Sequence, residues 1–175
     1  MQNVFFGKTI AGPQSKANLR RWIGREQYRM DFRLKKLKRG YGGLNMGLGP
    51  GPYRGDPMPD DAIHIAEDAF WFLELGIKKH CAQYSRPYAH YGVTEVSREE
   101  WSEILREWEG LSVQLEAAKL TPQLEILRVV PKDTRKMFIR DFDRNRRGLS
   151  KMIGLLSEWM RAELITGEQI SILGI

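Results

Sequence analysis

The side chains of this chain with the greatest potential for metal binding or nucleophilic catalysis are its three histidines and its single cysteine. His64 and Asp68 are four residues apart, so one face of a helix would present both. His80, Cys81 and His90 are the further candidate ligands. A zinc site needs three or four protein ligands, and neighbours on a helix point about 100° apart. We therefore interpret His80 as a helix-end histidine and Cys81 as a small buried thiol, and we expect no metal and no other cofactor.

The sequence motifs that identify common enzymes are missing. Gly7-Lys8 lacks the preceding glycine of a phosphate-binding loop, and the glycines of 40–49 do not form Gly-x-Gly-x-x-Gly between a strand and a helix. There is no Gly-x-Ser-x-Gly elbow and no acid-x-Lys triplet. We predict that the chain is not an enzyme. An enzyme that uses His64, Asp68 or His90 without a local motif is the second alternative.

Two rows of like charge are the most distinctive polar pattern. Ser97-Arg98-Glu99-Glu100 forms a capping box, because the serine and the glutamate three residues later satisfy each other's backbone amides. On the helix that it opens, four carboxylates gather on one side: Glu99, Glu100, Glu103 and Glu107. On the last predicted helix the cations recur every three or four residues: Lys136, Arg140, Arg144, Arg147 and Lys151.

Like charges at this spacing weaken a helix by a few tenths of a kcal/mol each, so a compensating interaction is expected. Either the two rows face each other and are structural, or each is a docking surface. We predict that the four glutamates bind a protein partner with basic groups.

The segment 16–54 supports a different function, because it combines many cations with Tyr28, Tyr41 and Tyr53. Cations neutralise phosphates, and aromatic rings stack on bases. The first alternative is therefore an RNA- or DNA-binding protein that uses Arg29, Arg33, Lys35, Lys36, Lys38 and Arg39. The simpler interpretation makes these cations the solvated face of a strand or helix.

The elements that must position these residues begin with a basic, glycine-rich part. A strand is predicted over 3–11, a helix over about 15–25 and a strand over about 27–37, although apolar spacing over 15–39 also fits a helix. Glycine and proline make 40–59 a loop, with a short strand near Leu44–Leu48 as one possibility.

The remaining sequence predicts mainly helix. Long helices are expected over about 61–80, 97–119 and 133–166, with a short helix or turn over 121–130, Gly167 as a C-cap and a terminal strand over 169–175. The helices should bury a common core of Phe70, Trp71, Leu105, Trp108, Leu156 and Trp159. The predicted fold class is α+β, mainly α: three long packed helices with a small N-terminal β element and a C-terminal strand.

The composition fits an ordinary globular protein of 175 residues, with 42% hydrophobic and 29% charged residues. The formal net charge of +6 is uneven: residues 1–59 hold twelve Lys or Arg against three Asp or Glu, and residues 60–175 hold sixteen against nineteen. We expect a single domain over 1–175, with the basic segment 1–59 as an alternative subdomain before a helical part at 60–175. The N-terminus does not look like a signal peptide and no apolar stretch is long enough for a membrane helix, so we expect a cytoplasmic protein that does not engage a membrane.

Two stretches of the sequence resemble a known class of protein. Residues 96–108, which contain the capping box, Trp101 and Trp108, and residues 155–174, which contain Trp159 and Gly167, resemble segments of immunity proteins from bacterial toxin systems of the contact-dependent inhibition or polymorphic type. The resemblance implies a small bacterial protein that binds a cognate toxin domain and blocks it. Many such proteins are acidic because their nuclease targets are basic, and the basic first third of this chain departs from that pattern.

Overall fold

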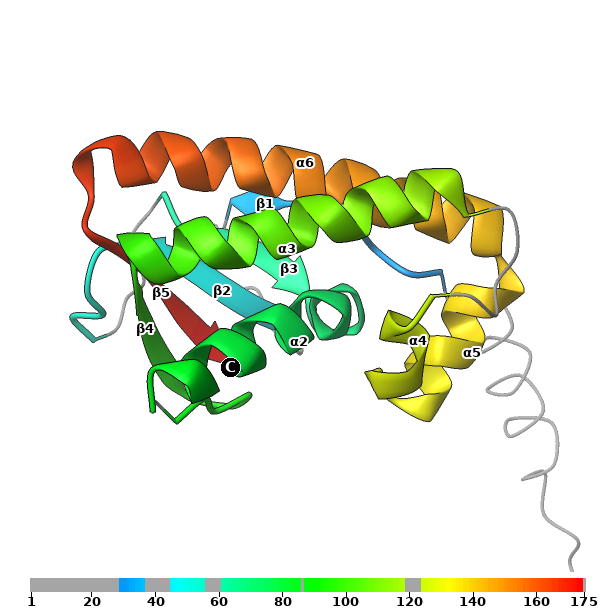
Figure 1. Cartoon of the computed structure of the whole chain (residues 1–175), viewed down its shortest axis with the longest axis horizontal. Coiled ribbons are helices and arrows are strands. Elements are labelled where there is room, and N and C mark those ends of the chain that lie inside the picture. The colour runs from blue at the N-terminus through cyan, green and yellow to red at the C-terminus, as the bar shows by residue number, and fades with distance from the viewer. Residues whose placement is uncertain (1–28, 37–44, 56–60, 86, 119–123, 175) are drawn as a thin grey trace, which may run out of the picture.

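The fold joins an antiparallel sheet to a layer of helices (Figure 1). The computed structural model describes residues 29–36, 45–55, 61–85, 87–118 and 124–174. Its strands are β1 (Lys35–Lys36), β2 (Asn45–Pro50), β3 (Ile63–Ala66), β4 (Val93–Ser97) and β5 (Gln169–Gly174). Its helices are α2 (Glu67–Gln83), α3 (Arg98–Ala117), α4 (Ile126–Val129), α5 (Lys132–Arg140) and α6 (Phe142–Thr166). The mainly helical α+β class is as predicted.

The sheet has the strand order β1-β3-β2-β5-β4, and every neighbouring pair is antiparallel. The last strand, β5, therefore lies between β2 and β4. Its final residue pairs with Met46, and the Gly174 N–H donates to Gly92 O at 2.9 Å. A side chain at Gly174 would overlap the backbone of His90, so this position requires glycine.

One face of the sheet forms the floor of the hydrophobic core. The register places Met46 beside Ile65, and Leu48 between Ile63 and Ile172, and all of these side chains are buried. Side chains alternate between the two faces of a strand, so these residues share one face. α2, α3 and α6 contact the strands, and Figure 1 shows α3 and α6 lying side by side over the sheet.

α3 begins where the sequence predicts, at a complete capping box. The Ser97 N–H donates to Glu100 Oε2 at 2.8 Å, and the Glu100 N–H donates to Ser97 Oγ at 3.3 Å. The buried side of α3 carries Trp101 and Trp108, whose indole rings meet edge to face. Trp101 donates to Ile170 O at 3.1 Å and Trp108 to Leu73 O at 3.0 Å, so neither ring leaves its N–H unsatisfied in the core.

Two of the predicted long helices differ from the structure. The first begins at Glu67 rather than near 61, because Ile63–Ala66 forms a strand paired with β2. A short apolar run followed directly by a helix cannot be separated from it by periodicity alone. The last helix is two helices, α5 and α6, that meet at Asp141. Asn145 stabilises the break by donating to the α5 carbonyls of Met137 and Phe138 at 3.0 and 3.1 Å.

The other predicted elements have mixed outcomes. The strand suggested near Leu44–Leu48 is β2, and the C-terminal strand and the Gly167 C-cap are confirmed. Of the strand predicted over 27–37, only Lys35–Lys36 is a strand among the described residues, and the helix predicted over 121–130 is described only as α4. β4 was not predicted. The elements expected over 3–11 and 15–25 lie outside the described residues.

The predicted core residues lie in one cluster. Phe70, Leu105, Trp108 and Leu156 are buried, whereas Trp71 and Trp159 are partly buried and contact the cluster from its edge. Across the described parts of the chain, none of the helices combines the length and the apolar character that a membrane crossing requires.

Trp108 gives a direct test of the core. Its side chain is 2% exposed, so we expect Trp108→Ala to lower the free energy of unfolding by about 3–5 kcal/mol in urea denaturation. The matched control is Val113→Ala on the same helix, because Val113 is 67% exposed and should change the free energy by less than about 0.5 kcal/mol. A similar small loss for Trp108→Ala would show that Trp108 does not belong to the core.

Candidate functional site

The predicted glutamate row divides into one structural and three surface residues. Glu100 is 3% exposed and belongs to the capping box of α3, so it is not available to a partner. Glu99 is exposed, and the side chains of Glu103 and Glu107 are 32% and 34% exposed. We call Glu99, Glu103 and Glu107, which follow one another at four-residue spacing along α3, the acidic face.

Two side chains of α2 contact two of these three carboxylates. His80 is buried and lies between them, with Nδ1 at 3.1 Å from Glu103 Oε2 and Nε2 at 3.4 Å from Glu107 Oε1. Neither ring nitrogen makes a hydrogen bond of good geometry, so these are close contacts rather than directed bonds. Lys79 Nζ pairs with Glu107. The compensating interaction expected for the glutamate row therefore comes from α2.

The exposed ring of Tyr84 lies in the negative electrostatic potential of this surface. Its pKa is raised above the ordinary tyrosine value, first by loss of solvation and then by the negative charges of Glu103 and Glu100. Glu99 acts in the same direction. A phenolate is therefore disfavoured here, and a positively charged group would be favoured at the same place.

A groove of about 420 Å³ continues from the acidic face. It lies between α2, α3 and α4, with Glu107 and Lys79 among its lining residues. Its apolar lining comes from Phe72, Leu75, Trp108, Leu111 and Ile126. Leu75 is 43% exposed, so the groove presents apolar surface to solvent directly beside a row of carboxylates.

Three of the five cations predicted to form a row on the last helix have acidic partners close to them in the sequence. Lys136 lies 3.5 Å from Asp133. Arg140 and Arg144 approach Asp141 at 3.8 and 3.7 Å. These pairs are on the surface and contribute little stability. An ion pair that joins α3 to α6 connects Glu109 with Arg161 at 2.6 Å.

The residues predicted to bind nucleic acid lie in and before β1. Arg29 and Lys36 are exposed. Arg33 and Lys35 both contact Asp31 at 2.8 Å, and these bonds, led by that of Arg33, hold the pKa of the Asp31 carboxyl well below its usual range. Lys38 and Arg39 lie outside the described residues. Two of the four described cations are therefore already paired with a carboxylate.

The structure does not bring His64 and Asp68 onto one helix face. His64 lies in β3, where burial lowers its pKa, and Asp68 lies in the first turn of α2, where it accepts a hydrogen bond from Thr134 Oγ1 at 3.0 Å. Within the part of the chain that is described, no group of three or more histidine, cysteine or carboxylate side chains is placed to hold a metal ion.

His90 belongs instead to a polar cluster that the sequence analysis missed. Its Nδ1 lies 2.6 Å from Glu74 Oε1 and its Nε2 lies 3.0 Å from Glu67 Oε1. The ring stacks on Trp71 with 3.9 Å between centroids, and Lys78 holds the other oxygen of Glu74 at 2.8 Å. The two ring nitrogens of His90 therefore each contact a different carboxylate of α2. The cluster fixes the segment before β4 to α2. Its only local sequence signal is that Glu67, Glu74 and Lys78 share one side of a helix.

Comparison with known proteins adds no further information about this site. No protein-family model matches the chain, and no curated protein and no solved structure gives a significant match. The function has to be inferred from the residues themselves.

The His90 cluster predicts a measurable loss of stability. Glu74 is almost fully buried, so removing the imidazole leaves a buried carboxylate with Lys78 but without the hydrogen-bonding partner on its other oxygen. We expect His90→Ala to lower the free energy of unfolding by about 2–4 kcal/mol in chemical denaturation. Tyr91→Phe, which removes only the hydroxyl that donates to Glu67 at 2.6 Å, should cost about 1 kcal/mol. Equal effects of the two substitutions would contradict a fixing role for His90.

Proposed function

We propose that this chain is a protein-binding module whose acidic face and adjoining groove bind a partner with a cationic, partly apolar surface. The proposal rests on one observation. Glu107 belongs to the acidic face and also lines the groove, so the carboxylates of α3 and the groove form one continuous surface. A charged rim beside an apolar depression is the usual composition of a protein interface, in which the apolar part supplies affinity and the charged part supplies specificity.

The charge arrangement supports a cationic partner in particular. His80 and Lys79 contact Glu103 and Glu107, but both carboxylates remain about one-third exposed, and Glu99 is exposed beside them. An arriving lysine or arginine relieves the repulsion within the row and reaches it without being buried itself. Such pairing raises the association rate more than it raises the intrinsic affinity.

The resemblance of residues 96–108 and 155–174 to immunity proteins gives the proposal its specific form. In that form the chain is a bacterial immunity protein that acts in the cytoplasm and neutralises a cognate toxin domain by direct binding. The test is to co-express the chain with the toxin domain encoded immediately beside it and to measure survival. Complex formation between the purified proteins is then measured at two ionic strengths.

A charge reversal on the acidic face should slow the association. We expect Glu103→Lys to lower the association rate by about tenfold at low salt and to reduce its dependence on ionic strength. Glu158→Lys is the matched control, because Glu158 is an exposed glutamate on α6 and the charge change is the same. Equal rates for the two variants would overturn the role of the acidic face.

The groove is tested separately from the charges. Leu75→Ser should weaken binding mainly by faster dissociation, because it removes apolar contact area and leaves the carboxylates in place. Val113→Ser is the control, since Val113 is 67% exposed on α3 and is not among the residues that line the groove. If Leu75→Ser leaves the dissociation rate unchanged, the groove is not part of the interface.

A further inference from the structure

The outward side of α5 carries two lysines and an exposed isoleucine. Lys132, Lys136 and Ile139 follow one another at spacings of four and three residues, so they lie on one side of the helix. Lys132 is exposed, the Lys136 side chain is 65% exposed, and Ile139 is 43% exposed. The opposite side of α5 packs into the core through the buried residues Thr134 and Phe138. We call Lys132, Lys136 and Ile139 the basic ridge, and the core contacts keep it facing the solvent.

The cations of the basic ridge have little to hold them within their own chain. Lys136 lies 3.5 Å from Asp133, whose side chain is 90% exposed, and an ion pair this exposed contributes little. In the described part of the chain, no carboxylate pairs with Lys132 and no ion pair joins the ridge to α3. A surface that complements the ridge needs two carboxylates with an apolar hollow beside them.

α3 has these features in the same order and at the same spacing. Glu103, Glu107 and Gly110 are again four and three residues apart. Gly110 lines the groove between α2, α3 and α4, and a side chain added at this glycine would meet nothing within 4 Å. Four residues of a helix span about 6 Å and three span about 4.5 Å, so the two helices present matching distances. The groove is therefore open at the position that corresponds to the isoleucine of the ridge.

The match defines how the two helices would lie against each other. When α5 of a second copy runs in the same direction as α3, both lysines face carboxylates and the isoleucine enters the groove. The facing residues, in chain order, are Lys132 with Glu103, Lys136 with Glu107, and Ile139 with Gly110. The α5 of the same chain does not make this contact, because its Phe138 ring lies 4.6 Å from the ring of Phe72 and holds the ridge outward.

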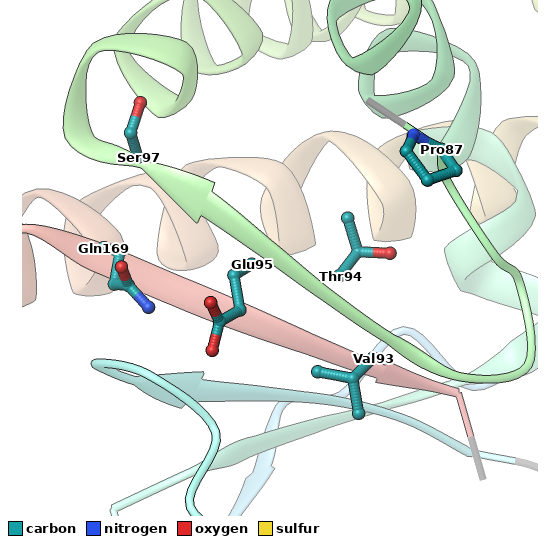
Figure 2. Close-up of a pocket in the computed structure, with 6 residues that line it drawn as sticks. All are labelled: Pro87, Val93, Thr94, Glu95, Ser97 and Gln169. Carbon is teal, nitrogen blue, oxygen red and sulfur yellow. The ribbon is translucent and has the colours of Figure 1, made fainter. Parts of the chain in front are cut away.

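The open cavity beside the outer strand β4 does not complement the ridge (Figure 2). Its volume is about 490 Å³, and Glu95 is the one charged residue among those described as lining it. Figure 2 shows Glu95 and Thr94 on opposite sides of the β4 ribbon. The Glu95 carboxylate already accepts a hydrogen bond from the Tyr53 N–H at 3.1 Å. One engaged carboxylate does not pair with two lysines, so α3 is the better match.

We infer that, while no other partner is bound, α5 of a second copy of this chain occupies the acidic face and the groove. Ile139 supplies the apolar contact, and the two lysines set the register. The ridge and the acidic face are different surfaces, so each copy can give one such contact and receive one. The inference rests on the proposed binding site, and it adds that the protein covers this site itself until a partner displaces the second copy.

Sedimentation equilibrium of the full-length protein at physiological ionic strength tests the self-association. We expect the weight-average mass to rise with concentration above the 20.3 kDa of a single chain. Repulsion between two copies of net charge +6 does not mask the contact, because it is screened over about 8 Å. A mass that stays at one chain up to about 1 mM overturns the inference. It leaves the proposed function standing, because binding of a toxin domain does not require a second copy.

Filling the groove should prevent the association without harming the fold. Gly110→Leu adds a side chain where nothing lies within 4 Å, and leucine favours helix more than glycine does, so the melting temperature should not fall. We expect the association constant to fall by about tenfold or more. Gly154→Leu is the matched control, because Gly154 is an exposed glycine of α6 with equal open space around it. Equal association of the two variants overturns the inference.

A charge exchange tests the register. Glu103→Lys and Lys132→Glu should each weaken self-association by about tenfold, because like charges then face each other. An equimolar mixture of the two variants should recover the association, because opposite charges meet again in both contacts between unlike copies. Substitutions on surfaces that do not touch would not compensate in this way. Absence of recovery in the mixture, or wild-type association that neither reversal weakens, overturns the inference.

Discussion

The C-terminal strand β5 lies inside the sheet, between β2 and β4, so the whole fold depends on hydrogen bonds that the last residues of the chain form. The start of α3 is tied to the same strand region. Arg98 donates from its guanidinium to Gly167 O at 2.7 Å, and Trp101 donates to Ile170 O at 3.1 Å. The helix that carries the acidic face is therefore oriented by contacts with the end of the chain. Pairing between segments so distant in sequence costs entropy, because the intervening chain has to be closed into a loop.

α2 links two polar clusters, because each end of it contacts a different one. Near its C-terminal end, His80 lies between Glu103 and Glu107 of α3. Further toward its start, Glu67 and Glu74 hold His90 in the segment that leads into β4. In both places an imidazole lies between two carboxylates. The first arrangement positions the acidic face, and the second positions the approach to the edge strand.

Local patterns allowed α3, its Ser97 capping box and the Gly167 C-cap to be predicted, whereas the sheet depends on distant pairings that no local pattern encodes. The capping box at Ser97 and the apolar stripe of α3 are local, and both were read correctly from sequence. β3 was read as helix because its apolar residues run directly into those of α2. β4 does alternate, with Thr94 and Val96 buried and Val93 and Glu95 exposed, but five residues are too few to stand out beside a strong helix signal.

The candidate site could likewise be predicted where it depends on local spacing, and could not be predicted where it depends on tertiary packing. The four-residue spacing of the acidic face is a helix property and follows from sequence, but the burial of Glu100 and the contact with His80 follow from tertiary packing. The pairing of His90 with Glu67 crosses a loop, so spacing gives no indication of it.

The acidic face favours a cationic partner, although the chain itself carries a net charge of +6. The net charge of the whole chain does not determine which charge of partner is favoured, because at physiological ionic strength a charge is screened over about 8 Å. An approaching lysine or arginine therefore responds to the few groups nearest to it. Beside α3 these are Glu99, Glu103 and Glu107, with Lys79 and His80 of α2 next to them. Local arrangement rather than total charge sets the specificity of this surface, and the excess of cations in the first third of the sequence is compatible with a basic partner.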